Sequence, residues 1–239
     1  AWPMWPAIAP WLANIQDIDM FAQTPLRDLV RYYDRLAPDY DKLHRRWLRY
    51  AGGEAQAALE GVVRAIALPH TDLLDAGCGT GALARALIAE GISPSKVTLL
   101  DPSSEMLARC ADIHAAKVKG RLEALPFQDG QFDIVTCAWA LETTPKFGVA
   151  LAELCRVIRP GGALCLAFCA DMPTRGIADN LMRHTLSWRG SGQFLSREKV
   201  VEALVASQEF DVRIIPSTGP AATLLARRQV KADAVPVSL

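Results

Sequence analysis

From residue 71 onward, short apolar runs alternate with longer segments whose apolar residues recur every three or four positions. The short runs are typical of buried strands, and the longer spacing is typical of helices that pack on a core. Strands are predicted over residues 72–76, 96–100, 115–119, 132–138 and 163–169, with a closing pair at 212–215 and 222–226. This alternation indicates an α/β domain with a parallel sheet and crossover helices.

Helices are predicted between these strands over residues 82–90, from Ser103 or Ser104 through 110, over 147–158 and from Ser196. Gly91 follows the first helix as a C-cap glycine should, and Ser196 is a suitable N-cap. Residues 159–162 predict a turn. Residues 171–195 break the alternation and predict an insertion that shapes a substrate pocket.

The N-terminal part of the chain is helical in pattern. Residues 25–68 predict two helices, parted at Pro38, and a third apolar series after Gly52 and Gly53. In residues 1–24, tryptophans and isoleucines recur at helical spacing once Pro10 is passed. This segment suits either a lid over an apolar pocket or a peripheral contact of residues 1–20 with a membrane surface. The lid is favoured because residues 1–24 contain no Lys or Arg, which anionic lipid attracts.

Three units follow from these patterns: an N-terminal helical cap (1–70), an α/β domain (71–228) with the insertion at 171–195, and a loose tail (229–239). A chain of 239 residues is ample for one such domain. Apolar residues make up 51% and charged residues 22%, as in folded globular proteins.

Charge and cysteine content narrow the function classes. Lys+Arg and Asp+Glu number 26 each and form no long run of one sign, so nucleic acid is not an expected partner. The six cysteines show no C-x-x-C pair and no zinc spacing, so no metal site is expected. Free thiols within apolar runs predict a reducing, cytoplasmic location, and no apolar stretch is long enough to span a membrane. The oligomeric state does not follow from the sequence.

The stretch L-D-A-G-C-G-T-G at residues 74–81 carries the candidate chemistry. A strand that turns through glycines into a helix N-terminus is suited to a polar ligand, because glycine permits positive φ and a close approach of the ligand. Asp101 ends the next strand, where a carboxylate can accept hydrogen bonds from ribose hydroxyls. The spacing is G-x-G-x-G and not the dinucleotide G-x-G-x-x-G, which disfavours a nicotinamide-dependent oxidoreductase.

These residues, with D-P-S-S-E-M-L at 101–107, L-P-F at 125–127 and R-V-I-R-P-G-G at 156–162, resemble the class I S-adenosylmethionine-dependent methyltransferases. The resemblance is strongest to small-molecule enzymes related to quinone biosynthesis. It implies a seven-stranded, mostly parallel Rossmann-like sheet with helices on both faces, an antiparallel last strand and an N-terminal helical lid. The cofactor implied is S-adenosylmethionine.

The resemblance also implies which residues bind this cofactor. Backbone contacts of the glycine loop and the Asp75 carboxylate would hold the methionine end, and Asp101 would hold the ribose. Tyr33 and Tyr40 would close over the sulfonium side. The full expected set is Tyr33, Tyr40, Asp75, Gly77, Cys78, Gly79, Asp101, Pro102, Met106, Leu122, Glu123 and Ala138.

One residue departs from the family pattern. The family carries Asp, an acceptor for the adenine amino group, where this chain has Arg121. Arginine has only donors, which leaves Glu123 or a backbone carbonyl for that role. The Leu122 N–H remains available to adenine N1.

Two functions remain open: methyl transfer to a small, apolar or amphiphilic acceptor at O, N or C by in-line attack on the sulfonium methyl, and cofactor binding without catalysis or with a regulatory role. Positioning can supply much of the acceleration of methyl transfer, and a base is needed only when the acceptor must lose a proton. Candidate bases are Tyr40, His44, Glu142 and His184. Candidate acceptor contacts are Trp139, Met172, Trp188 and Phe194.

Overall fold

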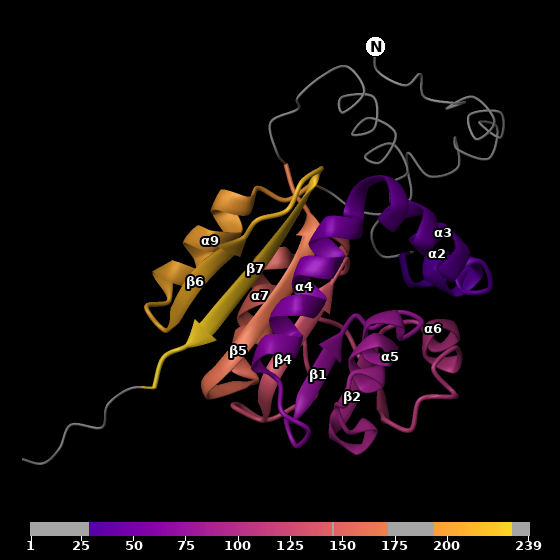
Figure 1. The fold of residues 1–239 in the computed structure, drawn as a ribbon, viewed down its shortest axis with the longest axis horizontal. Helices are drawn as coiled ribbons and strands as arrows, with labels where there is room; N and C mark the ends of the chain where they lie inside the picture. The colour runs from indigo at the N-terminus through magenta and orange to yellow at the C-terminus, as the bar shows by residue number, and fades with distance from the viewer. Residues whose placement is uncertain (1–28, 145, 172–193, 231–239) are drawn as a thin grey trace, which may run out of the picture.

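The computed structural model describes residues 29–144, 146–171 and 194–230, which form one seven-stranded sheet flanked by helices (Figure 1). The strand order is β3-β2-β1-β4-β5-β7-β6. β1 to β5 pair in parallel, whereas β7 is antiparallel to both β5 and β6. The predicted mostly parallel sheet with an antiparallel last strand is therefore confirmed. The strands are β1 (Leu73–Ala76), β2 (Val97–Asp101), β3 (Ala116–Lys119), β4 (Phe132–Ala138), β5 (Ile158–Cys169), β6 (Phe210–Ile215) and β7 (Ala221–Arg228).

Helices cover both faces of the sheet. Leu59 of α4 and Leu87 of α5 pack on one face, where α4 crosses in front of the strands in Figure 1. Leu154 of α7 and Leu204 of α9 pack on the other face. The described helices are α2 (Leu29–Leu36), α3 (Tyr40–Trp47), α4 (Gly53–Ile66), α5 (Ala82–Ala89), α6 (Ser104–Ala108), α7 (Phe147–Arg156) and α9 (Arg197–Ala206), with short turns η3 (Leu48–Gly52), η4 (Pro94–Lys96) and η5 (Leu141–Thr143).

The strand order places a binding site at one edge of the sheet. The chain moves outward from β1 to β2 and β3, then returns to the other side of β1 with β4. Ligands of open α/β sheets bind at the carboxyl ends of the strands, beside such a reversal. Asp75 and Asp101 lie at or beside the carboxyl ends of β1 and β2.

Two local predictions need correction. Gly52 and Gly53 do not separate two helices, because the π-helical turn η3 carries the chain from α3 into α4. A Cβ on Gly52 would lie 2.5 Å from Nε1 of Trp47, so glycine is what lets the turn close on this indole. Residues 159–162 belong to β5, although the β4–β5 register shifts beside them as the chain bulges.

Several predicted segments lie outside the described residues: the lid at 1–24, most of the insertion at 171–195 and most of the tail. Within the described ranges, no helix is long and apolar enough to cross a membrane.

Arg156 fastens the loop before β4 to α7. Its guanidinium donates to the carbonyl oxygens of Leu125 (3.1 Å) and Phe127 (2.8 Å) and pairs with Glu153 at 2.7 Å. The Leu125 N–H in turn donates to Glu153. Arg156, the first residue of the R-V-I-R-P-G-G stretch, is therefore a structural clamp on the L-P-F loop.

We expect Arg156→Met to lower the free energy of unfolding by about 2 kcal/mol, since it leaves two carbonyl groups and the Glu153 carboxylate without their charged donor. Urea unfolding measures the change. Arg64→Met is the matched control: Arg64 pairs with Glu90 at the surface, with 56% of its side chain exposed, so its loss should cost less than about 1 kcal/mol. Equal costs for the two variants would contradict the clamp.

Candidate cofactor and acceptor site

A cavity with about 690 Å³ of empty space, open solvent included, lies at the carboxyl ends of β1, β2 and β4. The N-terminal helices, the glycine loop, the ends of β2 and β4, and the segment before α7 all contribute to its wall. The lining residues are Leu29, Val30, Tyr33, Tyr40, Gly77, Gly79, Asp101, Pro102, Met106, Arg121, Leu122, Glu123, Trp139, Ala140, Thr143 and Thr144.

The glycine loop is held by its own N–H groups. Those of Gly77 and Cys78 donate to the carbonyl oxygen of Leu100 at 2.7 and 3.0 Å. The Gly79 N–H donates to Oδ2 of Asp101 at 2.9 Å. These three donors therefore shape the loop rather than point freely at a ligand, which differs from the free N–H groups that the sequence pattern indicates.

Gly77 has a φ of +74°, and a Cβ at this position would lie 2.4 Å from the Cβ of Ala140. Both the backbone conformation and the close approach of the segment after β4 thus require glycine. Gly79, at φ +54°, faces the ring of Tyr40, 3.7 Å from where a Cβ would stand.

Asp101 joins the glycine loop to the next helix. Its Oδ1 accepts from the Ser103 N–H at 2.8 Å, while Oδ2 accepts from Gly79. Only 7% of the residue is exposed, and burial raises the pKa of its carboxyl to about 6 even though both hydrogen bonds lower it.

Asp75 lies beneath the loop and is almost fully buried. Its Oδ1 accepts from Oγ1 of Thr136 at 3.0 Å, whereas Oδ2 has no partner among the described residues. Burial raises the pKa of the Asp75 carboxyl to about 7, with a smaller upward effect from Asp101. An unpartnered buried carboxylate oxygen is costly unless a donor or cation meets it.

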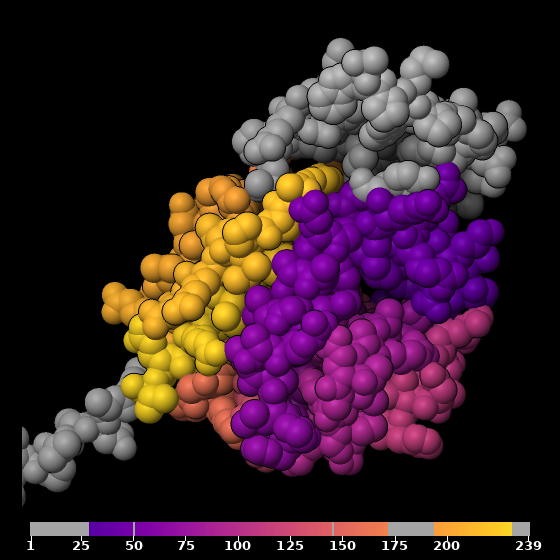
Figure 2. Space-filling view, in the orientation of Figure 1, coloured from indigo at the N-terminus to yellow at the C-terminus, as the bar shows by residue number. Residues whose placement is uncertain are grey.

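The N-terminal helices are tied to the site by two carboxylates. Asp34 of α2 accepts from the Ser103 hydroxyl, and Asp41 of α3 accepts from the Thr80 hydroxyl, each at 2.5 Å. Ser103 also caps α6, accepting from the Met106 N–H at 3.1 Å. The indigo helices consequently sit against the magenta segment that carries the glycine loop and α6 (Figure 2).

Aromatic side chains of these helices form one wall. The rings of Tyr33 and Tyr40 meet edge to face at 6.2 Å, and Tyr40 stacks on His44 at 5.5 Å. Burial raises the pKa of both tyrosines, so they stay protonated at neutral pH. Burial lowers the pKa of His44, which leaves its imidazole neutral and able to accept a proton. His44 itself is behind Tyr40 and not among the lining residues.

Trp139 is another aromatic residue in the cavity wall. Its indole N–H donates to Gln56 of α4 at 2.7 Å, and its ring meets Trp47 edge to face at 5.6 Å. Its φ is +58°, a left-handed conformation that is rare for a residue with a large side chain.

Glu142 lies behind the wall, in η5. Its Oε1 accepts from the Cys169 N–H at 2.9 Å, and Oε2 has no partner within the described part of the chain. Burial raises the pKa of this carboxyl. Glu142 does not line the cavity, so a role as base would require a proton path through its neighbours.

Arg121 and Glu123 stand at the far end of the cavity. Glu123 accepts from the Thr144 hydroxyl at 2.7 Å, and its other oxygen lies 3.7 Å from Nε of Arg121. The Arg121 carbonyl accepts from the Ala124 N–H. The acceptor nearest to the position where the family has Asp is therefore the Glu123 carboxylate, held in place by Thr144.

Nine of the twelve expected cofactor residues line this one cavity; Asp75, Cys78 and Ala138 lie outside its wall. Of the expected bases, only Tyr40 lines it, and His184 is outside the described residues. Trp139 is the one expected acceptor contact in the wall; Phe194 is elsewhere, and Met172 and Trp188 are not described. The binding roles stay predictions. Sequence reasoning did not select Leu29, Val30, Ala140, Thr143 and Thr144 as site residues, because nothing in their type distinguishes them from core or loop residues.

Comparison with known proteins shows what this chain is similar to. Residues 74–166 match the methyltransferase domain family. A ubiquinone/menaquinone biosynthesis C-methyltransferase of Methylobacterium nodulans is 38% identical over 140 residues, 55% of this chain and 52% of that protein. Residues 74–166 are thus a methyltransferase domain, and this part of the chain is similar to class I S-adenosylmethionine-dependent methyltransferases.

Two further proteins are similar to this chain, one in sequence and one in fold alone. A malonyl-acyl-carrier protein O-methyltransferase of Enterobacter lignolyticus is 33% identical over 180 residues, 72% of this chain and 65% of that protein. The DhpI–SAH complex shares the fold, with a TM-score of 0.64 at 20% identity, over 85% of this chain and 97% of that chain. The chain spans about half of the length of the Methylobacterium enzyme and about two thirds of that of the Enterobacter enzyme.

The cavity fits S-adenosylmethionine, the cofactor of this family. Although Asp75 lies beneath the cavity wall and does not line it, its unpartnered oxygen would suit the cationic amino-acid end of such a ligand, because burial has removed the water that would otherwise solvate it. The carboxylate of Asp101 suits ribose hydroxyls. Gly79 leaves a space beside Tyr40 that no side chain fills.

We expect Gly77→Ala to abolish measurable binding of S-adenosylhomocysteine, since the added methyl group collides with Ala140 and the backbone must leave its positive φ. Isothermal titration calorimetry measures the affinity. Gly61→Ala is the control: no atom lies within 4 Å of the Cβ it would add in α4, so it should bind normally and be slightly more stable. Normal binding by Gly77→Ala would refute the proposed loop geometry.

The raised pKa of Asp75 predicts opposite effects on binding and stability. A cationic amino group prefers the ionised carboxylate, so affinity for S-adenosylhomocysteine should fall about tenfold from pH 8 to pH 6 as Asp75 takes up a proton. The folded protein holds this proton up to about pH 7, whereas the unfolded chain loses it near 3.8. Stability without ligand therefore falls as pH rises through this window and stays low above it.

Asp75→Asn keeps the hydrogen bond from Thr136 and removes the charge. We expect this variant to bind at least about tenfold more weakly at pH 8, to lose most of the pH dependence, and to unfold at higher urea concentration than wild type at pH 8. Asp72→Asn, at the opposite end of β1, should retain the wild-type pH profile of binding. A stabilised variant with unchanged affinity would mean that Asp75 does not face the ligand.

Proposed function

We propose that this protein transfers the methyl group of S-adenosylmethionine to a small, apolar or amphiphilic acceptor. The observation that carries the proposal is the cavity that brings the glycine loop, Asp101 and Met106 together with Tyr33 and Tyr40 of the N-terminal helices. The bound cofactor would supply an electrophilic sulfonium methyl group. The chain needs to bind, orient and desolvate the two reactants.

The role proposed for each residue follows from its position at the cavity. Asp75 and Asp101 would hold the two polar ends of the cofactor, and Glu123, fixed by Thr144, would accept from its adenine amino group. The rings of Tyr33, Tyr40 and Trp139 form the aromatic part of the remaining wall, beside aliphatic residues and two threonines. An aromatic wall excludes water and suits a flat or apolar acceptor beside the methyl group.

His44 is the nearest candidate for proton removal. It is neutral, stacked on Tyr40 and partly buried. If the methyl acceptor is a hydroxyl or an acidic carbon, it must lose a proton. The Tyr40 hydroxyl at the cavity would take up that proton while it passes its own proton to the neutral imidazole of His44. Carboxylate or thiolate acceptors need no such transfer.

The relatives support two acceptor chemistries. One acts in ubiquinone and menaquinone biosynthesis as a C-methyltransferase, and another is an O-methyltransferase of malonyl-acyl-carrier protein. A quinol ring carbon and a malonyl carboxylate both present an electron-rich atom on a carrier that is lipophilic or flexible. We propose these as the first acceptor classes to test.

A second function is favoured by one observation. Arg121, a cation with only donors, lines the cavity where the family pattern has an acceptor. If Glu123 does not replace that acceptor, the cavity binds its cofactor weakly, and the protein is then a cofactor-binding or regulatory member of the fold, since fold does not fix function.

Release of S-adenosylhomocysteine, measured with a panel of demethylated quinols and malonyl thioesters, distinguishes methyl transfer from the cofactor-binding or regulatory function. If the protein transfers methyl groups, at least one of these two acceptor classes should give turnover. If the Tyr40 hydroxyl relays a proton, Tyr40→Phe should lower kcat about tenfold or more. Leu43→Ala, on the exposed side of the same helix, is the control. Tight cofactor binding without turnover on any acceptor would favour the regulatory function.

A further inference from the structure

Two cysteines meet at the glycine loop. Cys78 lies within the loop, and Cys110 follows α6, 32 residues later in the chain. The Sγ atoms of Cys78 and Cys110 lie 3.6 and 3.5 Å from the same carbonyl oxygen, that of Gly79. Each thiol also shifts the pKa of the other. Gly81 makes room for this pair, because a Cβ there would lie 3.0 Å from Sγ of Cys110.

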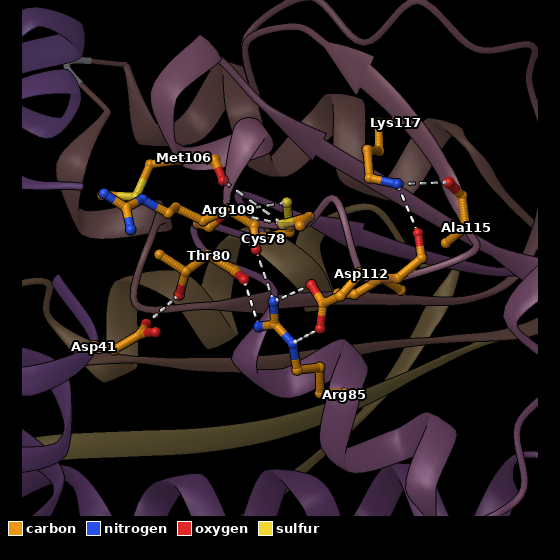
Figure 3. A network of polar contacts seen from close by, with 12 residues as sticks. Asp41, Cys78, Thr80, Arg85, Met106, Arg109, Asp112, Ala115 and Lys117 are labelled. Carbon is orange, nitrogen blue, oxygen red and sulfur yellow. Dashed lines mark hydrogen bonds and ion pairs between the residues drawn. The ribbon is translucent and has the colours of Figure 1, made fainter. Parts of the chain in front are cut away.

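Two basic side chains lie near Cys110, whereas the pKa of Cys78 is raised by Cys110, by burial and by the carboxylates of Asp75 and Asp101. The Arg85 guanidinium is fixed by Asp112 and by the carbonyl groups of Thr80 and Arg109, and the Lys117 ammonium binds the carbonyl groups of Ile113 and Ala115 (Figure 3). The neighbouring Cys78 thiol, assisted by Arg85 and Lys117, lowers the pKa of the Cys110 thiol, whereas burial and the Asp75 carboxylate raise it. Thiolate character of this kind makes a cysteine reactive.

We propose that Cys78 and Cys110 are a dithiol modification site: a hydroperoxide converts them to a reversible disulfide that weakens binding at the glycine loop. The effect on binding rests on the proposed function, whereas the disulfide itself does not. Reversible disulfides are the kind found where thiols are otherwise kept reduced.

The chemistry balances with hydrogen peroxide as the oxidant. The Cys110 thiolate attacks one peroxide oxygen, breaking the O–O bond and forming a sulfenic acid, and the departing hydroxide takes up the proton as water. The Cys78 thiol then attacks that sulfur and forms the S–S bond, and the second oxygen leaves as water with the thiol proton. Two thiols are oxidised by two electrons, and one peroxide is reduced to two waters. Cys110 itself is fully buried, so peroxide would have to reach its sulfur from the side of Cys78, which keeps 8% of its surface exposed.

The bond would act on the site through Gly79. A disulfide brings its sulfurs to about 2.05 Å and removes both S–H donors from the Gly79 carbonyl. The same residue donates its N–H to Asp101, the carboxylate assigned to the ribose. Moving Gly79 therefore disturbs both the loop and Asp101.

Cys155 offers a matched control. It is half-buried on α7, and burial raises the pKa of its thiol to about 12, so it lacks the stabilised thiolate of the pair. Cys155→Ser should respond to peroxide as wild type does. Cys110→Ser keeps a donor for the Gly79 carbonyl and removes one sulfur.

The experiment treats the full chain with hydrogen peroxide, maps disulfides by non-reducing peptide mass spectrometry and measures S-adenosylhomocysteine affinity before and after. We expect a mass loss of about 2 Da located in a peptide pair joined at Cys78 and Cys110. We also expect a Kd that rises about tenfold and recovers with dithiothreitol. Cys110→Ser should bind the ligand and show neither change.

Other outcomes overturn the proposal in separate parts. Absence of the joined peptide from wild type, or a disulfide between other cysteines, rejects the modification site whatever the variants do. A mapped Cys78–Cys110 disulfide with Kd changed less than about twofold rejects the control of binding. If the reduced protein fails to bind S-adenosylhomocysteine at all, the proposed function fails, while the peptide map still decides the disulfide. Should Cys110→Ser misfold, Cys110→Ala replaces it.

Discussion

Two carboxylates buried side by side at the strand ends dominate this structure. Burial raises the pKa of both Asp75 and Asp101, and one oxygen of Asp75 has no partner among the described residues. A fold optimised only for stability would replace them, because buried charge is costly. Their retention is understandable if a cationic, hydroxyl-bearing ligand completes their hydrogen bonding. The buried carboxylates then destabilise the protein most when no ligand is bound.

The same carboxylate of Asp101 organises the surrounding backbone. It fixes the glycine loop through Gly79 and the start of α6 through Ser103, and Ser103 in turn binds Asp34 of α2. Elements from three parts of the chain thus share one small network. Change at any of them is transmitted to the others over a few hydrogen bonds, which makes the N-terminal helices part of the binding site and not only a cover.

Much of this arrangement could be predicted from local patterns. Alternating apolar runs predict the strands within a few residues, and the glycines with Asp101 indicate the edge of the sheet where a ligand binds. What the sequence did not reveal depends on contacts between distant segments. The π-helical turn at Gly52 exists because Trp47 needs space, and the loop N–H groups turn inward because the Leu100 carbonyl lies beneath them. The pairing of Cys78 with Cys110 likewise follows from packing and not from spacing along the chain.

Trp139 occupies a backbone conformation that an ordinary side chain avoids, and it is held there by Gln56 of α4 and Trp47 of α3. The backbone strain at Trp139 therefore lies in the wall of the cavity, and the contacts that maintain it come from residues outside the wall. An indole that is conformationally locked, hydrogen-bonded and exposed to the cavity makes this wall an internal optical probe, whose emission would register the arrival of a ligand without any added label.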